Sequence, residues 1–260
     1  MVQPLLELRG VNKSFGVVHV LHDVDFAVYP GQVTALVGDN GAGKSTLVKI
    51  IAGIYGRDSG EYFFDGTKVE VHGPRDVAHL GVEVVYQDLA LCDNLDIVQN
   101  MFLGREEKKR IGLDEVTMES RARETLASLS VRTVKSVRQS VASLSGGQRQ
   151  TVAIAKAVLW NSKVVLLDEP TAALGVAQTR QVLDLVRRLA EQGLAVVLIS
   201  HNLHDIFEVA DRITVLRLGK NIAVLERSRT TQQEVVHAIT AGIPTKVAGI
   251  DGTGGEEAVA

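Results

Sequence analysis

A glycine-rich segment that ends in lysine and serine is the part of this sequence best suited to bind phosphate. It reads Gly-Asp-Asn-Gly-Ala-Gly-Lys-Ser over residues 38–45 and fits the pattern G-x-x-x-x-G-K-[ST] of a phosphate-binding loop. Glycines let the backbone turn tightly, so that several N–H groups point at phosphate oxygens. The Lys44 ammonium reaches the β- and γ-phosphates, and the Ser45 hydroxyl is a ligand for Mg2+. The expected nucleotide-binding residues here are Gly38, Asp39, Asn40, Gly41, Ala42, Gly43, Lys44, Ser45 and Thr46.

Two carboxylates follow an apolar run further along the chain. Val164–Leu167 predicts a buried strand, and Asp168 and Glu169 come directly after it. Ligands of open parallel sheets bind at the carboxyl ends of the strands. At that place Asp168 holds Mg2+ through its water shell, and Glu169 polarises the attacking water. The alternative is an exposed acidic turn, which the upstream phosphate-binding loop disfavours.

A second pair of glycines stands immediately before a helix predicted over Gly146–Leu159. The segment reads Leu-Ser-Gly-Gly-Gln over residues 144–148. Ser145 is a good N-cap, and the glycines expose backbone N–H groups, so that a second anion site is expected. One nucleotide bound at residues 38–45 does not need this site, and a plain capping turn is the alternative.

The elements around these motifs alternate between strands and helices after a strand-rich start. Such alternation predicts a mostly parallel sheet with helices on both faces. Residues 88–160 instead have long helical stretches and predict a helical subdomain inserted into a domain over 1–246, whereas the glycines and acidic residues of 247–260 predict a loose tail. The predicted strands are Val33–Val37, Val82–Val85, Ala195–Ile199, Ile213–Leu216 and a hairpin of Tyr62–Phe64 with Val69–Val71; the predicted helices are Thr46–Ile54, Leu113–Leu129, Val176–Glu191, Leu203–Val209 and Glu234–Ile239.

Composition excludes several classes of protein. The 260 residues carry a formal net charge of −3, so there is no basic field over the whole chain for nucleic acid. The single cysteine, Cys92, excludes an intramolecular disulfide framework and a multi-cysteine zinc site. No apolar run approaches the roughly 18 residues of a membrane span, and the first ten residues do not read as a signal peptide. We therefore expect a soluble, cytosolic protein that can still dock on a membrane partner.

The order of these motifs resembles that of an ATP-binding cassette ATPase. The phosphate-binding loop, Leu-Ser-Gly-Gly-Gln, the strand ending in Asp168-Glu169, and Ser200-His201 follow one another as in that family, over about residues 5–240. The resemblance implies an α/β fold: a P-loop NTPase core with a mostly parallel sheet, an N-terminal antiparallel β-subdomain and an inserted α-helical subdomain. It also implies ATP and Mg2+ as cofactors.

The resemblance assigns further roles one residue at a time. Phe15 matches the aromatic that stacks on adenine, Gln87 matches a glutamine that binds Mg2+ and water, and His201 matches the histidine that contacts the γ-phosphate. The resemblance thus implies Glu169, His201 and Gln87 as catalytic residues and Ser45, Gln87 and Asp168 as metal ligands. The residues that would contact the ATP held by the opposite subunit are Ser145, Gly146, Gly147 and Gln148.

One position departs from the family pattern. Ala172-Ala173-Leu174-Gly175 stands where the family usually has Ser-Ala-Leu-Asp, so Gly175 replaces an aspartate that helps couple the two sites of the dimer. The aspartate does not touch ATP directly in the family. Hydrolysis is therefore still expected.

Three segments resemble the ATPases of bacterial monosaccharide importers of the ribose, xylose and fructose class: residues 52–60, 84–104 and 200–211. This implies a homodimer with ATP sandwiched between the copies, an integral-membrane sugar permease and, indirectly, a sugar-binding protein, at the cytoplasmic face of the membrane and without nucleic acid. The expected permease dock lies after Gln87, with packing inside the helical subdomain as the alternative. Its apolar residues are Leu89, Leu91, Leu95, Ile97, Met101 and Phe102.

Two other functions remain open from the sequence. One is a soluble cassette ATPase that acts on DNA or ribosomes, although no long coiled-coil insertion, zinc cysteines or second cassette is present. The other is a cassette that binds ATP as a regulatory module without hydrolysing it, for which Gly175 is the only support.

Overall fold

A six-stranded sheet forms the centre of the molecule. The computed structural model describes residues 3–129, 131 and 134–242, so the predicted tail over 247–260 lies outside the described residues. The sheet has the order β10-β9-β3-β8-β7-β6, and every neighbouring pair is parallel except β10 with β9. Its strands are β3 (Val33–Val37), β6 (Val82–Val85), β7 (Val164–Asp168), β8 (Ala195–Ile199), β9 (Arg212–Arg217) and β10 (Lys220–Glu226).

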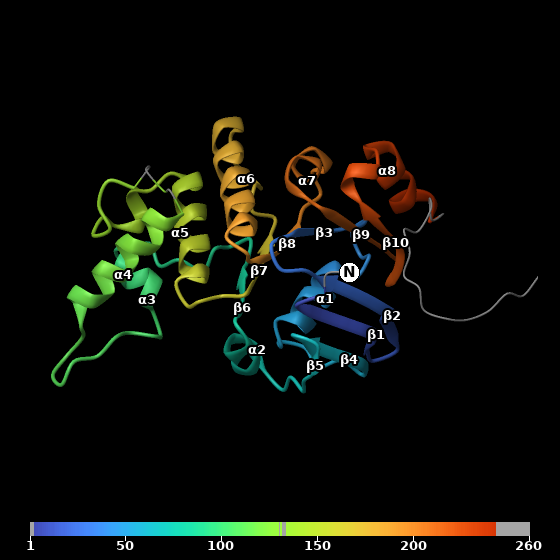
Figure 1. The fold of residues 1–260 in the computed structure, drawn as a ribbon, viewed down its shortest axis with the longest axis horizontal. Coiled ribbons are helices and arrows are strands. Elements are labelled where there is room, and N and C mark those ends of the chain that lie inside the picture. The colour runs from blue at the N-terminus through green and yellow to red at the C-terminus, as the bar shows by residue number, and fades with distance from the viewer. Residues whose placement is uncertain (1–2, 130, 132–133, 243–260) are drawn as a thin grey trace, which may run out of the picture.

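A second, antiparallel sheet of order β2-β1-β4-β5 packs against the central sheet through a shared apolar cluster. Its strands are β1 (Leu6–Phe15), β2 (Val18–Val28), β4 (Ser59–Phe64) and β5 (Thr67–Lys68). Figure 1 shows this sheet on the opposite side of the central sheet from α6, α7 and α8, with α1 between the two sheets. The fold class predicted from the sequence is thus confirmed. The helices are α1 (Lys44–Ile51), α2 (Pro74–Leu80), α3 (Ile97–Phe102), α4 (Glu115–Ser128), α5 (Gly146–Val158), α6 (Val176–Glu191), α7 (Leu203–Val209) and α8 (Gln232–Ala241).

The apolar core explains why the central strands hold their places. Every residue of β3 and β8 is buried, which matches their unbroken apolar runs, because a parallel strand is covered on both faces. One hydrophobic cluster joins the central sheet to the helices α3 to α8. A second cluster joins the sheet to α1 and the antiparallel sheet. The central sheet is therefore buried between two hydrophobic cores.

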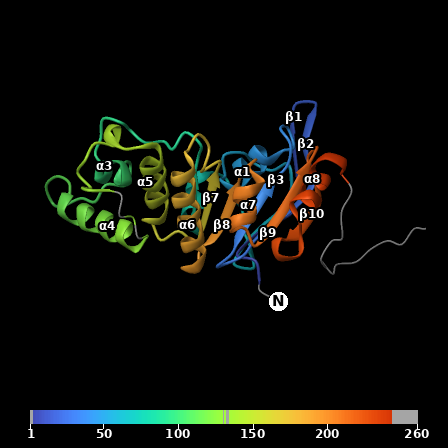
Figure 2. The same cartoon turned by 90° about the horizontal axis from the view of Figure 1, so that it is seen from above.

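Helices α3, α4 and α5 form a separate group at one end of the long axis (Figures 1 and 2). Arg138 ties this group together, since its guanidinium pairs with Asp96 before α3 and with Glu119 on α4. Ile97, Met101 and Phe102 are almost fully buried in its core. They cannot form an exposed permease dock, so packing inside the helical group is the correct interpretation for these three residues. Leu89 and Leu91 are partly buried against the same core.

Three elements differ from the sequence-based expectation. Val69–Val71 is not a strand, because the ladder with β4 ends at Lys68 and Asp76 accepts N–H bonds from His72 and Gly73, which turns the chain into α2. The short α2 was not predicted. Strand β10 was not predicted either, although Leu218-Gly219 makes the tight turn that pairs it with β9.

Among the described residues, no helix combines the length and the apolar character that crossing a bilayer requires.

Candidate functional site

The phosphate-binding loop connects the buried strand β3 to α1. Gly38 has φ of 153°, and a Cβ there would lie 2.2 Å from the carbonyl oxygen of Leu216. Gly43 has φ of 100°, and its Cβ would lie 2.6 Å from the Leu21 side chain. The fold of the loop thus favours glycine at both positions. The loop encloses a cavity of about 180 Å3 that is lined by Val20 and by residues 40–46.

Lys44 is folded back onto the loop that precedes it. Its Nζ donates hydrogen bonds to the carbonyl oxygens of Gly38, at 2.7 Å, and Asp39, at 3.0 Å. Burial lowers the pKa of the Lys44 ammonium, while the negative charges of Glu169, Asp39 and Asp168 oppose that shift. The two carbonyls therefore hold the ammonium at the mouth of the loop, within the electrostatic reach of both carboxylates.

The carboxylates at the end of β7 differ in their surroundings. Burial, reinforced by the charge of Glu169, raises the pKa of Asp168, and Lys44 opposes this rise. Glu169 has a left-handed backbone, with φ of 50°, and its N–H donates to the carbonyl of Ile199 on the neighbouring strand. A left-handed non-glycine residue is strained, and such residues concentrate at functional sites. The strained backbone aims Glu169 away from the strand and toward the loop after β8.

His201 meets Glu169 from that loop. Its Nδ1 lies 2.8 Å from Oε2 of Glu169, and its side chain is 77% exposed whereas that of Glu169 is 18% exposed. With the proton on Nδ1, the imidazole donates to one carboxylate oxygen and leaves the other free. A carboxylate held in this way has the geometry expected of a general base.

The strand order explains how distant residues meet. The loop at residues 38–45 follows β3, His201 follows β8, Asp168 ends β7 with Glu169 directly after it, and Gln87 follows β6. These four strands are consecutive neighbours in the sheet. Val85 pairs with Leu167, and Gln87 and Glu169 each come two residues after this pair. Gln87 is exposed. The predicted loop, catalytic and metal-binding residues therefore gather along one edge of the sheet, where ligands of parallel sheets bind, whereas Phe15 and residues 145–148 lie elsewhere.

The residues at this edge fit a magnesium ion bound together with a phosphate. The described residues contain no group of three or more His, Cys, Asp and Glu side chains able to hold a metal alone. Ser45, Asp168 and Gln87 instead supply isolated oxygen donors beside the loop, and Mg2+ prefers one or two carboxylates completed by substrate phosphates and water.

Phe15 ends β1 at the tight turn into β2. Its ring is 43% exposed and makes an edge contact with Tyr55, with the ring centroids 5.2 Å apart. Lys13 lies over the same ring, with its Nζ 5.4 Å from the centroid. Phe15 pairs with Val18, two residues before the Val20 that lines the loop cavity, and an aromatic left exposed there fits a stacking surface for a base.

Residues 145–148 form a well-capped helix start that lies apart from the first loop. Ser145 is the N-cap of α5: its Oγ accepts the N–H of Gln148, and Gln148 Oε1 accepts the N–H of Ser145. Gly147 packs against Gln178 of α6, and Gly146 packs against Leu174. None of these four residues lines the cavity at residues 40–46. In Figures 1 and 2, α5 lies in the helical group at one end of the long axis, away from α1 and the phosphate-binding loop that precedes it.

Gly175 is the N-cap of α6 and supplies no side-chain cap. Its N–H donates to Oε1 of Gln178, at 3.2 Å, and Ala173 just before it is left-handed, with φ of 59°. The replaced aspartate position thus adjoins residues 145–148 within one chain.

A buried carboxylate behind the site was not found from the sequence. Asp205 of α7 is 2% exposed and accepts hydrogen bonds from Thr171 Oγ1, at 2.7 Å, and from Asn202 Nδ2, at 3.0 Å. Thr171 follows Glu169, and Asn202 follows His201, so Asp205 fixes the two loops that bring these residues together. The only sequence signal was an acidic residue in the first turn of a short helix.

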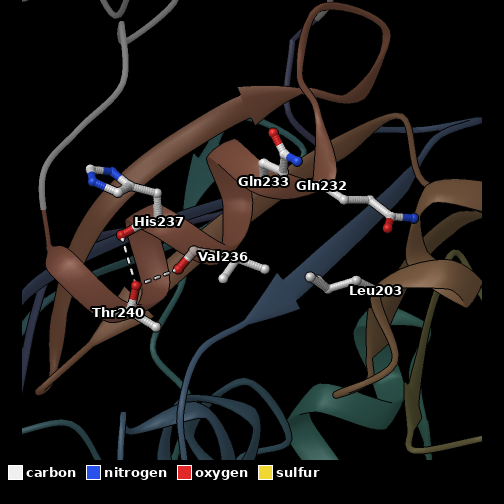
Figure 3. Close-up of a pocket in the computed structure, with 6 residues that line it drawn as sticks. All are labelled: Leu203, Gln232, Gln233, Val236, His237 and Thr240. Carbon is white, nitrogen blue, oxygen red and sulfur yellow. Dashed lines mark hydrogen bonds between the residues drawn. The ribbon is translucent and has the colours of Figure 1, made fainter.

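A wider groove lies between the start of α7 and α8 (Figure 3). It has a volume of about 400 Å3 and contains none of the predicted site residues, although Leu203 on its rim comes two residues after His201. Val236 and Leu203 face one another across it in Figure 3. The lining residues are Leu203, Gln232, Gln233, Val236, His237 and Thr240.

Comparison with known proteins identifies the family. The model of the ABC transporter family matches residues 21–172. The fructose import ATP-binding protein of Rhizobium meliloti is 44% identical over 245 residues, which cover 92% of this chain and 94% of that protein. The xylose/arabinose import ATP-binding protein of Sulfolobus acidocaldarius is 47% identical over 236 residues, which cover 91% of this chain and 94% of that protein.

A solved dimeric structure of a bacterial ABC transporter cassette is also similar, with a TM-score of 0.73 and 26% identity over 87% of this chain and 100% of that one. The fold and the phosphate-binding loop define a P-loop ATPase. The chain belongs to the ABC transporter family and is an ATP-binding cassette ATPase.

Proposed function

We propose that two copies of this chain bind ATP between them and hydrolyse it to drive the import of a monosaccharide through a membrane permease. The observation that carries the hydrolytic part is the contact of Glu169 with His201 at the same sheet edge as Lys44 and Asp168. The sugar-import part is supported by relatives named for fructose and xylose/arabinose import, which align with more than nine-tenths of the chain.

The loop residues bind the substrate first. Backbone N–H groups of residues 40–46 surround the β-phosphate, and Lys44 exchanges the carbonyls of Gly38 and Asp39 for phosphate oxygens. A Mg2+ ion held by Ser45, Asp168 and Gln87 would supply charge stabilisation for the phosphates. The partly buried position of Asp168 strengthens such electrostatic interactions by excluding water.

Glu169 then acts on the attacking water. The carboxylate oxygen not engaged by His201 accepts a proton from water, the water oxygen attacks the γ-phosphorus, and ADP leaves with the bridging oxygen. His201 keeps the carboxylate oriented and presents its exposed face to the γ-phosphate. Asp205 holds both loops in register through Thr171 and Asn202.

The second copy completes the site. Ser145 caps α5, which lies away from α1 in Figure 1, so its N-terminal N–H groups suit binding to the γ-phosphate of ATP held by a partner. ATP shared in this way closes the pair, and loss of the γ-phosphate reopens it. Docked on the permease at the cytoplasmic face of the membrane, this cycle would power alternating access, while the permease and a separate sugar-binding protein choose the sugar.

A pull-down of tagged Glu169→Gln protein with ATP from its native cells tests the proposal. Recovery of a polytopic permease and a sugar-binding protein is expected. Recovery of DNA-repair or ribosomal proteins without a permease would contradict the transport role and favour a soluble target.

The hydrolytic role is tested separately on the wild-type protein assembled with the recovered permease. We expect release of phosphate from ATP. The absence of release from that assembly would instead favour a module that binds ATP without hydrolysing it.

A further inference from the structure

The aromatic ring of Phe15 is held by contacts with Tyr55 and Lys13, to which the proposed function assigns no role. Tyr55 meets it edge-on, with an interplanar angle of 70° and 5.2 Å between ring centroids. Edge-to-face pairs at this spacing are attractive beyond the area that they bury. Lys13 contributes a cation 5.4 Å from the centroid of the same ring. Phe15 is 43% exposed, so burial alone does not hold its ring in place.

Tyr55 lies four residues after the end of α1, the helix that follows the phosphate-binding loop, and is tied to its last turn. Its N–H donates to the carbonyl of Lys49 in the last turn of α1, at 3.1 Å, and its ring is partly buried against the core beneath that helix. Lys49 also lies over the Tyr55 ring, with Nζ 5.2 Å from the centroid. The position of the Tyr55 ring is therefore fixed relative to α1, which begins at Lys44 in the phosphate-binding loop.

The backbone next to Phe15 is fixed by a second anchor. Asp58 accepts a hydrogen bond from the Ser14 N–H, at 2.6 Å, and another from Lys13 Nζ, at 2.7 Å. These two donors lower the pKa of the Asp58 carboxyl. Asp58 follows Tyr55 by three residues, so one short segment after α1 holds both the backbone and the ring at the end of β1.

We infer that Tyr55 is a positioning residue for the nucleotide base: it holds the Phe15 ring at a fixed place relative to the phosphate-binding helix, so that the adenine and the phosphates are bound at one spacing. This inference deepens the proposed function and rests on the predicted stacking of adenine on Phe15. Tyr55 does not itself touch the base; it acts through Phe15.

Measuring the Kd of ADP and the Kd of pyrophosphate, each with Mg2+, distinguishes a role of Tyr55 in placing the base from a role in supporting the fold. Pyrophosphate carries no base, so it reports on the phosphate-binding loop alone, and neither ligand is hydrolysed at the γ-position. Calorimetry on the full chain should show that Tyr55→Leu raises the Kd of ADP about two- to twelvefold, the value of one aromatic pair, and leaves the Kd of pyrophosphate unchanged.

Matched variants complete the test. Tyr55→Phe keeps the ring contact and should bind ADP as the wild type does. Tyr29→Leu removes a tyrosine that contacts Arg212 instead of Phe15 and should change neither Kd. In a Phe15→Leu background, which has already lost the stacking surface, Tyr55→Leu should cause no further loss of ADP affinity.

The outcomes distinguish the two levels of the inference. An equal rise in both Kd values for Tyr55→Leu would show that Tyr55 only supports α1, and would overturn its positioning role. The positioning role of Tyr55 would also be overturned if Phe15→Leu weakened ADP binding and Tyr55→Leu did not. An unchanged Kd of ADP in Phe15→Leu would overturn the adenine surface itself, and the role of Tyr55 with it.

Discussion

The start of α1 and the start of α5 are two helix N-termini suited to phosphate, and their surroundings differ sharply. At α1 the chain gathers Lys44, Asp168, Glu169 and His201 around the loop. At α5 it provides the capped Ser145 and two glycines, with Gln178 and Leu174 of the same chain packed behind them. In the proposed function the first region supplies the base, the cation and the metal ligands, and the second supplies only hydrogen-bond donors. On this proposal one chain carries one half of each of two sites, the catalytic half at α1 and the donor half at α5.

The largest effect is expected at the catalytic half. Glu169→Gln removes the proton acceptor but keeps the shape of the side chain, so ATP hydrolysis should fall about 10²- to 10⁴-fold. The Kd of ADP should stay unchanged, and ATP should trap a stable dimer in gel filtration. Glu191→Gln, at the exposed end of α6, is the matched control. Hydrolysis at the wild-type rate in Glu169→Gln would show that another group is the base.

The rigidity of the catalytic half is tested at Thr171. Thr171→Val removes the hydrogen bond to the buried carboxylate of Asp205 and should lower the free energy of unfolding by about 1.5–3 kcal/mol in urea titrations. Thr240→Val loses exposed bonds to the carbonyls of Val236 and His237 on α8 and should stay within about 0.5 kcal/mol of wild type. Equal losses in the two variants would mean that Asp205 is not a special support of the catalytic loops.

The charge of Lys44 makes the catalytic half sensitive to alkaline pH. Because burial lowers its pKa from 10.5, the ammonium loses its proton at a pH where an exposed lysine is still charged. Affinity for ADP should therefore fall as pH rises through the lowered pKa, by up to about tenfold per pH unit. Titration calorimetry over this range measures the slope, and Lys44→Ala should bind weakly with no such slope. An affinity that stays constant up to pH 10.5 would be inconsistent with a partly buried Lys44.

The smallest effect is expected beside the second half, at Gly175. Gly175→Asp gives α6 a side-chain N-cap that it lacks, and should raise the free energy of unfolding by a few tenths of a kcal/mol, since glycine is only slightly worse than aspartate at this position. Urea titration of the two proteins measures the difference. A loss of stability would show that the space before α6 does not accept a side chain, in spite of the open surroundings of the Gly175 Cβ position.

The motifs and the elements that carry them were predictable, because each is encoded by residues that are neighbours in the sequence. Strand β3, strand β8 and helices α6 and α7 begin and end where the apolar pattern places them. The Val69–Val71 strand was wrong because its alternation is outweighed by the turn that Asp76 caps. Asp205 and Tyr55 were missed because their roles depend on contacts between segments that lie far apart in the chain, and no local pattern encodes those contacts.

Mixing two inactive variants tests most directly whether a second copy completes the site. Lys44→Ala disables the phosphate-binding loop. Ser145→Asp keeps a good N-cap but sets a carboxylate against the partner's γ-phosphate, and Ser145→Asn is its uncharged control. Each disabled protein should be inactive alone, whereas a mixed pair contains one complete site, so that an equal mixture should regain roughly a quarter of the wild-type ATPase rate. No recovery, with mixed pairs confirmed by cross-linking, would contradict the shared site.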